Sequence, residues 1–464
     1  MDMLNPDQLH RTTKLEIDDG RARSIDEAQE IMASYVLQID VGSGIDESET
    51  RQAMLLTAVN TAVRAFLGGV HVCLRENVHL KVAWVAGVDM ATAIENYGGK
   101  IVKSLNCNFP TFVIGDVKEQ SVGSLVLHGT WEGWSGGVVE KTKDRLGESV
   151  EFPLAGMLAA SLGVSEAFQH LRGDVVAGRR STGLSLWDPR CDWRDTPASG
   201  EPCHYLPKRL WLIGLGHLGQ AYAWALSLLP YRNRAAVDLV LQDFDSIVKA
   251  NESTGMLSDD SLVGQKKARI VSTRLEALGF NTIINERHFD SATRRNINEP
   301  SVALAGVDDP APRRHLETAN FDLIVDAGLG GNPRNYLDIM IHSFPSGIEA
   351  SRTFRPRGTQ HTRPPVDQPA YQDFHRRAKT ITDLTDDEIR CGIIDVAGRS
   401  VGAAFVGCVA ATFVISEVLR FLAEAPRFEV FGVTLRNPEK IRVSPNTVKG
   451  PAINPGFVPA RDVT

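Results

Sequence analysis

Three glycines spaced G-x-G-x-x-G end a short apolar run in the stretch LWLIGLGHLG, residues 210–219. The run before them is typical of a buried parallel strand, and the residues after them are typical of a helix that ends before Pro230. Glycine at positions 214, 216 and 219 lets backbone N–H groups and the positive end of that helix approach a phosphate closely. The pattern predicts a nucleotide-binding strand–turn–helix unit, but the glycines alone do not say which nucleotide.

A second apolar run, AVDLVLQDFD, follows the expected helix and ends in Asp243 and Asp245. Strands that alternate with helices predict an α/β fold, here a Rossmann-like, doubly wound and mostly parallel sheet that binds ligands at the carboxyl ends of its strands. In such folds an acidic residue at the end of the second strand holds the ribose hydroxyls, and Asp243 fits that position. Up to this point an NAD-dependent oxidoreductase and an ATP-dependent enzyme fit equally well.

The residues further along the chain favour ATP over a nicotinamide cofactor. Asn251 comes next, then GQKKA places Lys267 at a helix start, and LAGVDDPAPRRHLE places Asp308 where a strand should end. A dehydrogenase has no use for another lysine and carboxylate there. An enzyme that handles a triphosphate does, because lysine offsets phosphate charge and a carboxylate holds Mg²⁺.

The order of these motifs resembles the ThiF/MoeB superfamily, which includes the ubiquitin-activating (E1-like) enzymes. The resemblance covers roughly residues 205–425, with the glycine loop, D-x-D, an Asn, G-x-x-K-A and the DDPAPR block in sequence. It implies an adenylation domain that binds ATP and Mg²⁺. The residues it implies for the nucleotide and metal are Gly214, Gly216, Gly219, Asp243, Asp245, Asn251, Lys267 and, for Mg²⁺, Asp308, while Arg313 matches an arginine with a structural role.

One departure from the family pattern concerns an arginine. The family usually has N-x-x-R-Q after D-x-D, whereas this chain has NESTG, so Thr254 stands where a phosphate-contacting arginine is expected. Loss of one such donor from an enzyme typically costs ~3 kcal/mol of transition-state stabilisation. Either another arginine replaces it, from the first half or from a second subunit, or the enzyme is slow. The candidates near the N-terminus are Arg11, Arg21 and Arg23.

The resemblance also implies an activity and partners. Family members adenylate the C-terminal carboxylate of a ubiquitin-like protein ending in glycine, and many then form a thioester on a cysteine and transfer the acyl group to an E2-like conjugating protein. Cys391 follows a long irregular segment, 345–390, and is our candidate for that thiol; the alternative is a small buried apolar residue. Chain length and the absence of the zinc-binding cysteine pairs fit bacterial members, some of which belong to antiphage conjugation systems.

The two halves of the chain share a helical pattern. AGMLAASLGVSEAFQHL (155–171) and VGCVAATFVISEVLRFL (406–422) align without a gap, which we interpret as a degenerate internal duplication; the alternative is two unrelated alanine-rich core helices. The first half keeps the helices but lacks the glycine spacing, so we expect it to be inactive. The expected organisation is an N-terminal half at 1–190, a linker at 191–208, an adenylation domain at 209–445 with a crossover and cysteine loop at 345–391, and a tail at 446–464.

Composition excludes some classes of protein. With 50 Lys and Arg against 57 Asp and Glu, the net charge of −7 argues against a nucleic-acid binder. The longest apolar run, 401–415, is shorter than the ~20 residues of a membrane span, so we expect a buried helix and no membrane association. The six cysteines without C-x-x-C and the polar N-terminal residues favour a reducing cytoplasm.

Three points stay open at the level of sequence. An NAD-dependent oxidoreductase fits Asp243 but gives Lys267 and Asp308 no function. A catalytically dead scaffold that binds nucleotide or a carrier protein is supported by Thr254. The assembly state is the third, with a homodimer among the possibilities.

Overall fold

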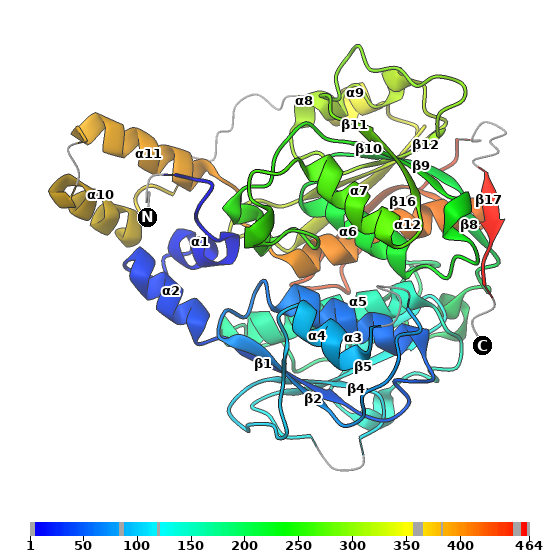
Figure 1. Ribbon diagram of the computed structural model, residues 1–464, viewed down its shortest axis with the longest axis horizontal. Coiled ribbons are helices and arrows are strands. Elements are labelled where there is room, and N and C mark those ends of the chain that lie inside the picture. The colour runs from blue at the N-terminus through cyan, green and yellow to red at the C-terminus, as the bar shows by residue number, and fades with distance from the viewer. Residues whose placement is uncertain are drawn as a thin grey trace.

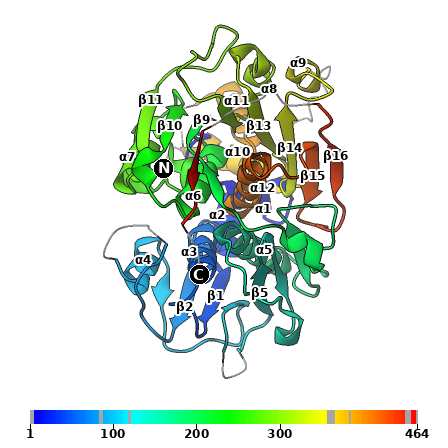
Figure 2. The ribbon, with the colours of Figure 1, turned by 90° about the vertical axis from the view of Figure 1, so that its right-hand side faces the viewer.

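The computed structural model describes residues 5–82, 88–117, 121–355, 365–381, 384–448 and 456–461. Two α/β halves lie one above the other, with a sheet on the outer side of each and helices between the sheets (Figures 1 and 2). A group of helices with a hydrophobic core of its own extends from one side (Figure 1). The architecture places both sheets in one continuous body.

The first half contains a seven-stranded sheet in the order β3-β2-β1-β4-β5-β6-β7. Pairing is parallel from β3 to β5 and antiparallel for β6 and β7. The strands are β1 (Val36–Val41), β2 (Gly69–Leu74), β3 (Lys100–Ile101), β4 (Thr111–Ile114), β5 (Val126–Glu132), β6 (Ser135–Val139) and β7 (Thr182–Ser185). The helices of this half are α3 (Glu49–Ala62), α4 (Met90–Asn96) and α5 (Pro153–Leu171).

The second half contains an eight-stranded sheet in the order β11-β10-β9-β12-β13-β14-β15-β16. The strands are β9 (Arg209–Ile213), β10 (Asp238–Gln242), β11 (Asn281–Asn285), β12 (Val302–Ala305), β13 (Leu323–Leu329), β14 (Asp338–Phe344), β15 (Phe428–Thr434) and β16 (Arg442–Pro445). The helices are α6 (His217–Leu228), α7 (Lys267–Ala277), α8 (Pro310–Arg313), α9 (Ala350–Thr353) and α12 (Ala404–Leu422). The register pairs Ile213 with both Gln242 and Ala305, so the three central parallel strands end at one level.

The strand order confirms the α/β doubly wound fold and the internal duplication. Counted within each half, both sheets run third, second, first, fourth, fifth, sixth, seventh, with the first five strands parallel and the next two antiparallel. The second sheet adds only β16 at its far edge. A shared order of seven strands is a far stronger sign of common ancestry than two similar helices.

Two matching glutamines support the duplication in detail. Gln52 is the fourth residue of α3, and Gln220 is the fourth residue of α6. Gln52 donates to the carbonyl of Ile45 in the loop before its helix, at 3.0 Å, and Gln220 donates to that of Leu215, at 3.1 Å. Each amide oxygen accepts a backbone N–H from a later segment of its own half. The same side chain therefore links equivalent loops in both halves.

The aligned helices α5 and α12 pack against each other, and α12 also packs against α6. The main hydrophobic core includes buried residues of both halves, such as Leu55, Leu158, Leu226 and Val414. Within the described residues, α12 is the one helix long and apolar enough to cross a membrane, and 89% of its most apolar window is buried inside the protein. The apolar run at 401–415 thus supplies the buried helix that the sequence predicts.

The segment expected to be irregular, 345–390, is largely helical where the structure describes it. It holds α9, α10 (Pro369–Ile381) and the beginning of α11 (Asp386–Gly398). These helices form because Thr385 and Glu388 make a capping box at the start of α11, and Tyr371 and Phe374 give α10 an apolar face. With α1 (Arg11–Asp18) and α2 (Ile25–Ala33), α10 and α11 enclose a small core of their own.

The linker and the tail meet in a two-stranded sheet. β8 (Tyr205–Pro207) lies at the end of the linker, and β17 (Phe457–Pro459) lies in the tail. Beyond β17, Arg461 pairs with Glu49 at 2.7 Å, at the start of α3. The tail therefore connects the second half with the first.

Candidate functional site

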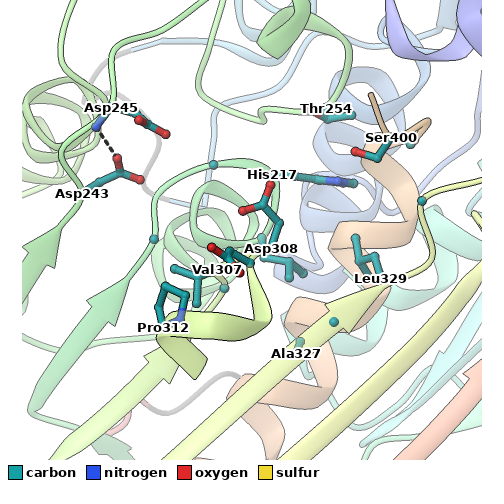
Figure 3. Close-up of a pocket in the computed structure, with 18 of the residues that line it drawn as sticks. His217, Asp243, Asp245, Thr254, Val307, Asp308, Pro312, Ala327, Leu329 and Ser400 are labelled. Atoms are coloured by element: carbon teal, nitrogen blue, oxygen red, sulfur yellow. Dashed lines mark hydrogen bonds between the residues drawn. The ribbon is translucent and has the colours of Figure 1, made fainter. Parts of the chain in front are cut away.

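A cavity of about 810 Å³ opens at the carboxyl ends of β9, β10, β12 and β13. Parallel strands present their carboxyl ends at one edge, and the turns that follow them form the walls. Residues from the glycine loop, the D-x-D turn, the lysine helix and the loop after β12 all line this single cavity (Figure 3). The motifs that the sequence spreads over a hundred residues therefore converge in space.

The glycine loop forms the floor of the cavity. Gly214 has a φ of +80°, a conformation that strongly favours glycine. A Cβ at Gly216 would meet nothing within 4 Å, so this backbone is open for close approach of a ligand. Gly219 does not line the cavity, contrary to the expectation. A Cβ there would lie 1.9 Å from the carbonyl oxygen of Gly214, so the third glycine serves the close packing of α6 on the loop.

Asp243 and Asp245 lie in the turn after β10. The carboxylate of Asp243 accepts the backbone N–H of Leu215 at 2.6 Å and that of Asp245 at 2.7 Å (Figure 3). Burial raises its pKa, and the nearby Lys267 ammonium opposes that shift. Lys267 is the first residue of α7, as predicted, and its Nζ lies 2.9 Å from a carboxylate oxygen of Asp245. The lysine is thus held at the cavity wall by an acidic partner.

Asn251 and Thr254 line the next wall. The side-chain oxygen of Asn251 accepts the backbone N–H of Val248 at 3.0 Å, which stabilises the turn η4 (Lys249–Ser253). Thr254 is only 8% exposed and borders the cavity. The position at which the family usually has an arginine therefore faces the site.

The three candidate replacements for that arginine differ in placement. Arg11 lines the cavity, its backbone N–H donates to Ser253 Oγ at 3.3 Å, and its Nη1 is buried without a hydrogen-bond partner. Arg21 instead pairs with Glu16 at 2.9 Å on the far side of α1, and the Arg23 side chain is exposed. Of the three, only Arg11 reaches the site.

Asp308 and Arg313 come from the loop after β12 and from α8. Asp308 is exposed to the cavity, and Figure 3 shows its carboxylate directed into the open space of the pocket. Arg313 is buried, donates through both Nε and Nη2 to Asp326 on β13, and lies with its guanidinium carbon 4.2 Å from the centre of the Phe354 ring. Arg313 also lines the cavity, and its pair with Asp326 fits the structural role that the resemblance implies.

Several lining residues were not predicted from sequence. His217 begins α6, and burial lowers its pKa to about 4, so it is neutral at pH 7. Arg399 and Ser400 enter from the end of α11, and Gly330 from the turn after β13. For Gly330 the signal was visible in the stretch AGLGG, but Arg399 and Ser400 carry no motif, and only the packing of α11 brings them in.

Cys391 does not line the cavity. It lies on the exposed side of α11, seven residues before Gly398, which does line it. At 1.5 Å of rise per residue this is roughly 10 Å along the helix. The cysteine is therefore close to the site but outside it, and it is not a buried apolar residue.

The cavity fits a nucleotide triphosphate chemically. Open glycine backbone, the Lys267 ammonium and the unpartnered Arg11 nitrogen are groups that bind phosphate. The described residues hold no group of three or more His, Cys, Asp or Glu side chains suited to a metal ion. Asp308, whose carboxylate faces the open space of the cavity, suits Mg²⁺, which is commonly bound by one or two carboxylates together with substrate phosphates and water.

The doubly wound sheet and the set of residues at its edge define an E1-like adenylation fold. Comparison with known proteins agrees: residues 36–186 match the BilD N-terminal domain model and residues 206–425 match the BilD C-terminal domain model. The chain is 39% identical over 423 residues to the bacterial E1-like protein BilD of Collimonas sp. (strain OK412), covering 91% of this chain and 90% of that protein. The chain therefore belongs to the BilD family of bacterial E1-like proteins.

Solved structures show weaker similarity. MccB of E. coli with selenomethionine MccA is 12% identical, with a TM-score of 0.35, over 69% of this chain and 94% of that chain. PaaA is 14% identical, with a TM-score of 0.32, over 52% and 64%. Scores this low bear on neither substrate nor mechanism.

Proposed function

We propose that this protein uses ATP and Mg²⁺ to adenylate the C-terminal carboxylate of a ubiquitin-like protein that ends in glycine. The observation that carries the proposal is the convergence of Lys267, Asp308 and the glycine loop on one cavity. Membership of an E1-like family supports the class of reaction. The identity of the carrier is an inference from that class.

The chemistry requires placement and fixed positive charge. A carboxylate oxygen attacks the α-phosphorus of ATP, the bond from that phosphorus to the bridging oxygen breaks, and pyrophosphate leaves with the electron pair. Two anions must meet, so cations that neutralise the phosphates lower the barrier. Lys267 and Arg11 supply protein charge, and Mg²⁺ held by Asp308 would supply more. No general base is needed, because the attacking carboxylate is ionised at neutral pH.

In a second step, the thiolate of Cys391 attacks the acyl carbon of the adenylate, AMP leaves, and the thiol proton goes to solvent. The resulting thioester keeps the carboxyl group activated for transfer to an E2-like protein. Because Cys391 lies outside the cavity, either α11 or the acyl chain moves between the steps. In the cell we propose a role in a cytoplasmic bacterial conjugation system, including antiphage defence, acting as a monomer or homodimer.

The test is exchange of labelled pyrophosphate into ATP in the presence of small candidate carrier proteins. Lys267→Ala and Asp308→Ala should each lower exchange by about 100-fold or more. Lys249→Ala is the matched control, because its ammonium pairs with Asp260 at 3.3 Å and does not line the cavity. Exchange that survives both cavity substitutions, or tight NADH binding without ATP binding, would refute the proposal.

A further inference from the structure

Arg64 lies two residues beyond the end of α3, in the first half, yet it bonds to the second half. Its Nη1 donates to the carbonyls of Glu252 at 2.5 Å and Ser258 at 3.0 Å, and its Nη2 donates to that of Met256 at 3.3 Å. Its Nε donates to the side-chain oxygen of Asn60 at 3.1 Å. The side chain therefore binds one continuous segment of the second half, residues 252–258, through three carbonyls.

All four of these acceptors are neutral oxygens. Arg64 is only 9% exposed, and a buried guanidinium charge without a directly bonded carboxylate costs stability. Other buried arginines here do have such a partner: Arg313 pairs with Asp326 and Arg420 with Glu417. Burial lowers the pKa of Arg64 to about 10, so it is still charged at pH 7. No carboxylate bonds to this guanidinium, and the carboxylates of Glu252 and Asp259 act on it only through space.

The charge lies directly behind the wall of the cavity. Thr254, which borders the cavity, stands between Glu252 and Met256, whose carbonyls Arg64 holds. The charge of Arg64 also contributes, after burial, to the lowered pKa values of His10 and His217, and His217 lines the cavity. The charge of Arg64 therefore acts on a residue that lines the cavity.

We propose that Arg64 is a positioning residue of the phosphate site, which adds positive charge behind the wall at Thr254 to the charge that Arg11 presents to the cavity. It acts through the segment it holds and through its field, without touching the ligand. In a buried environment of low dielectric, a positive charge attracts an anion in proportion to the anion's own charge. The inference rests on the proposed function. It gives the first half, which lacks the glycine spacing, a role in binding the phosphates.

The test is calorimetric titration of the full-length protein with ATP, ADP, AMP and inorganic tripolyphosphate. Arg64→Gln keeps an amide donor but loses the charge, and Arg64→Lys keeps the charge. We expect Arg64→Gln to weaken ATP and tripolyphosphate binding by about tenfold or more, ADP by less and AMP least, and Arg64→Lys to restore most of the loss. Arg180→Met is the control, because Arg180 also donates across the halves, to the carbonyl of Arg436 at 2.9 Å, but lies outside the cavity.

Equal weakening of ATP, ADP and AMP would show that Arg64 only supports the fold, and would overturn the inference. So would a lysine variant that behaves like the glutamine variant. If the unmodified protein binds none of these phosphates, both the inference and the proposed function fail. If binding is graded by charge but no carrier supports pyrophosphate exchange, the Arg64 inference stands and the proposed function fails.

Discussion

Lys267 is held ready for a ligand by Asp245, 2.9 Å away. The Asp245 side chain is about half exposed, so the pair is partly solvated and its net energy is small. A triphosphate, with several negative charges, competes well with one carboxylate for the ammonium. The D-x-D motif thus does two tasks: Asp243 fixes the glycine loop through Leu215, and Asp245 fixes the lysine.

Arg11 is the predicted substitute for the family arginine, because its Nη1 is buried at the cavity without a partner. Arg11→Ala should lower the rate of adenylate formation by about 10- to 100-fold, since it removes one cation facing the phosphates. The rate is measured by single-turnover formation of acyl-AMP. Arg23→Ala, at an exposed side chain on the same N-terminal segment, should leave the rate unchanged; equal loss in both variants would contradict the assignment.

His10 and His217 make stability depend on pH. Burial lowers the pKa of both from the ordinary 6.5 to about 4. The unfolded chain therefore binds protons that the folded protein does not between these values, so the free energy of unfolding should fall as the pH drops from 6.5 towards 4. Denaturant titrations over this range should show a shallower fall for His10→Gln; parallel profiles for the variant and the unmodified protein would contradict this.

Helix α11 connects the two proposed chemical steps. Its last residue, Gly398, lines the cavity, and its middle carries the exposed Cys391. The helix rests on the small core that it shares with α1, where Lys14 of α1 donates to the carbonyl of Ala397 at 3.1 Å. Arg11 lies on the same helix α1, so the cavity and the cysteine are linked through one pair of helices.

Cys391→Ala should leave pyrophosphate exchange unchanged and abolish a covalent carrier adduct that thiols cleave. The reason is that the first step uses the cavity, from which Cys391 is absent, whereas the second needs its sulfur. The adduct is followed by gel mobility with and without a reducing agent. Cys107→Ala removes another exposed thiol, in the first half, and should keep the adduct. An adduct that persists in Cys391→Ala assigns the thioester elsewhere.

The loop that replaces the glycine turn explains why we expect no nucleotide in the first half. Residues 42–48 join β1 to α3, where three residues suffice between β9 and α6. Arg51 lies against this loop, donates to the carbonyl of Gly44 at 3.2 Å and pairs with Glu148 at 3.1 Å. Arg145 adds a pair to Glu148 at 2.6 Å. Paired charged side chains thus pack against the loop that corresponds to the glycine turn.

The two halves depend on close helix approach at matching glycines. A Cβ on Gly156 of α5 would lie 2.3 Å from the carbonyl oxygen of Thr50 in α3, and one on Gly407 of α12 would lie 2.4 Å from Nε2 of His217 in α6. Both contacts join the long helix of a half to the first turn of the helix after its first strand. The four helices pack together as the centre of the molecule.

Gly156→Ala and Gly407→Ala should each lower the free energy of unfolding by about 1–3 kcal/mol, because a methyl group forces packed backbone or ring atoms apart. Gly407→Ala should also weaken ATP binding, since it displaces His217 at the cavity. Denaturant unfolding and calorimetry measure the two effects. Gly398→Ala, where a Cβ meets nothing within 4 Å, should not destabilise; comparable loss there would contradict the packing argument.

Much of the second half could be predicted from local patterns. The glycine spacing, the apolar run before it and Pro230 after it predict β9 and α6, and Lys267 does begin α7. Convergence of Asp243, Lys267 and Asp308 followed because parallel strands end at one edge. The aligned Gly156 and Gly407 indicate the duplication from the sequence alone. These features depend on residues close together in sequence, where local geometry dominates.

Long-range packing decided the rest. Gly219 fits the G-x-G-x-x-G spacing, but in the fold it allows α6 to pack closely on the glycine loop and does not face a ligand. The apolar faces of α10 and α11 are covered by α1 and α2, which come from the other end of the chain. Arg11 and Arg64 carry no motif at all, and their placement comes from a separate half of the chain. Short-range periodicity can be seen directly in one sequence, because it depends on residues that are close together in the chain. Contacts between distant segments depend on how all the elements of both halves pack together.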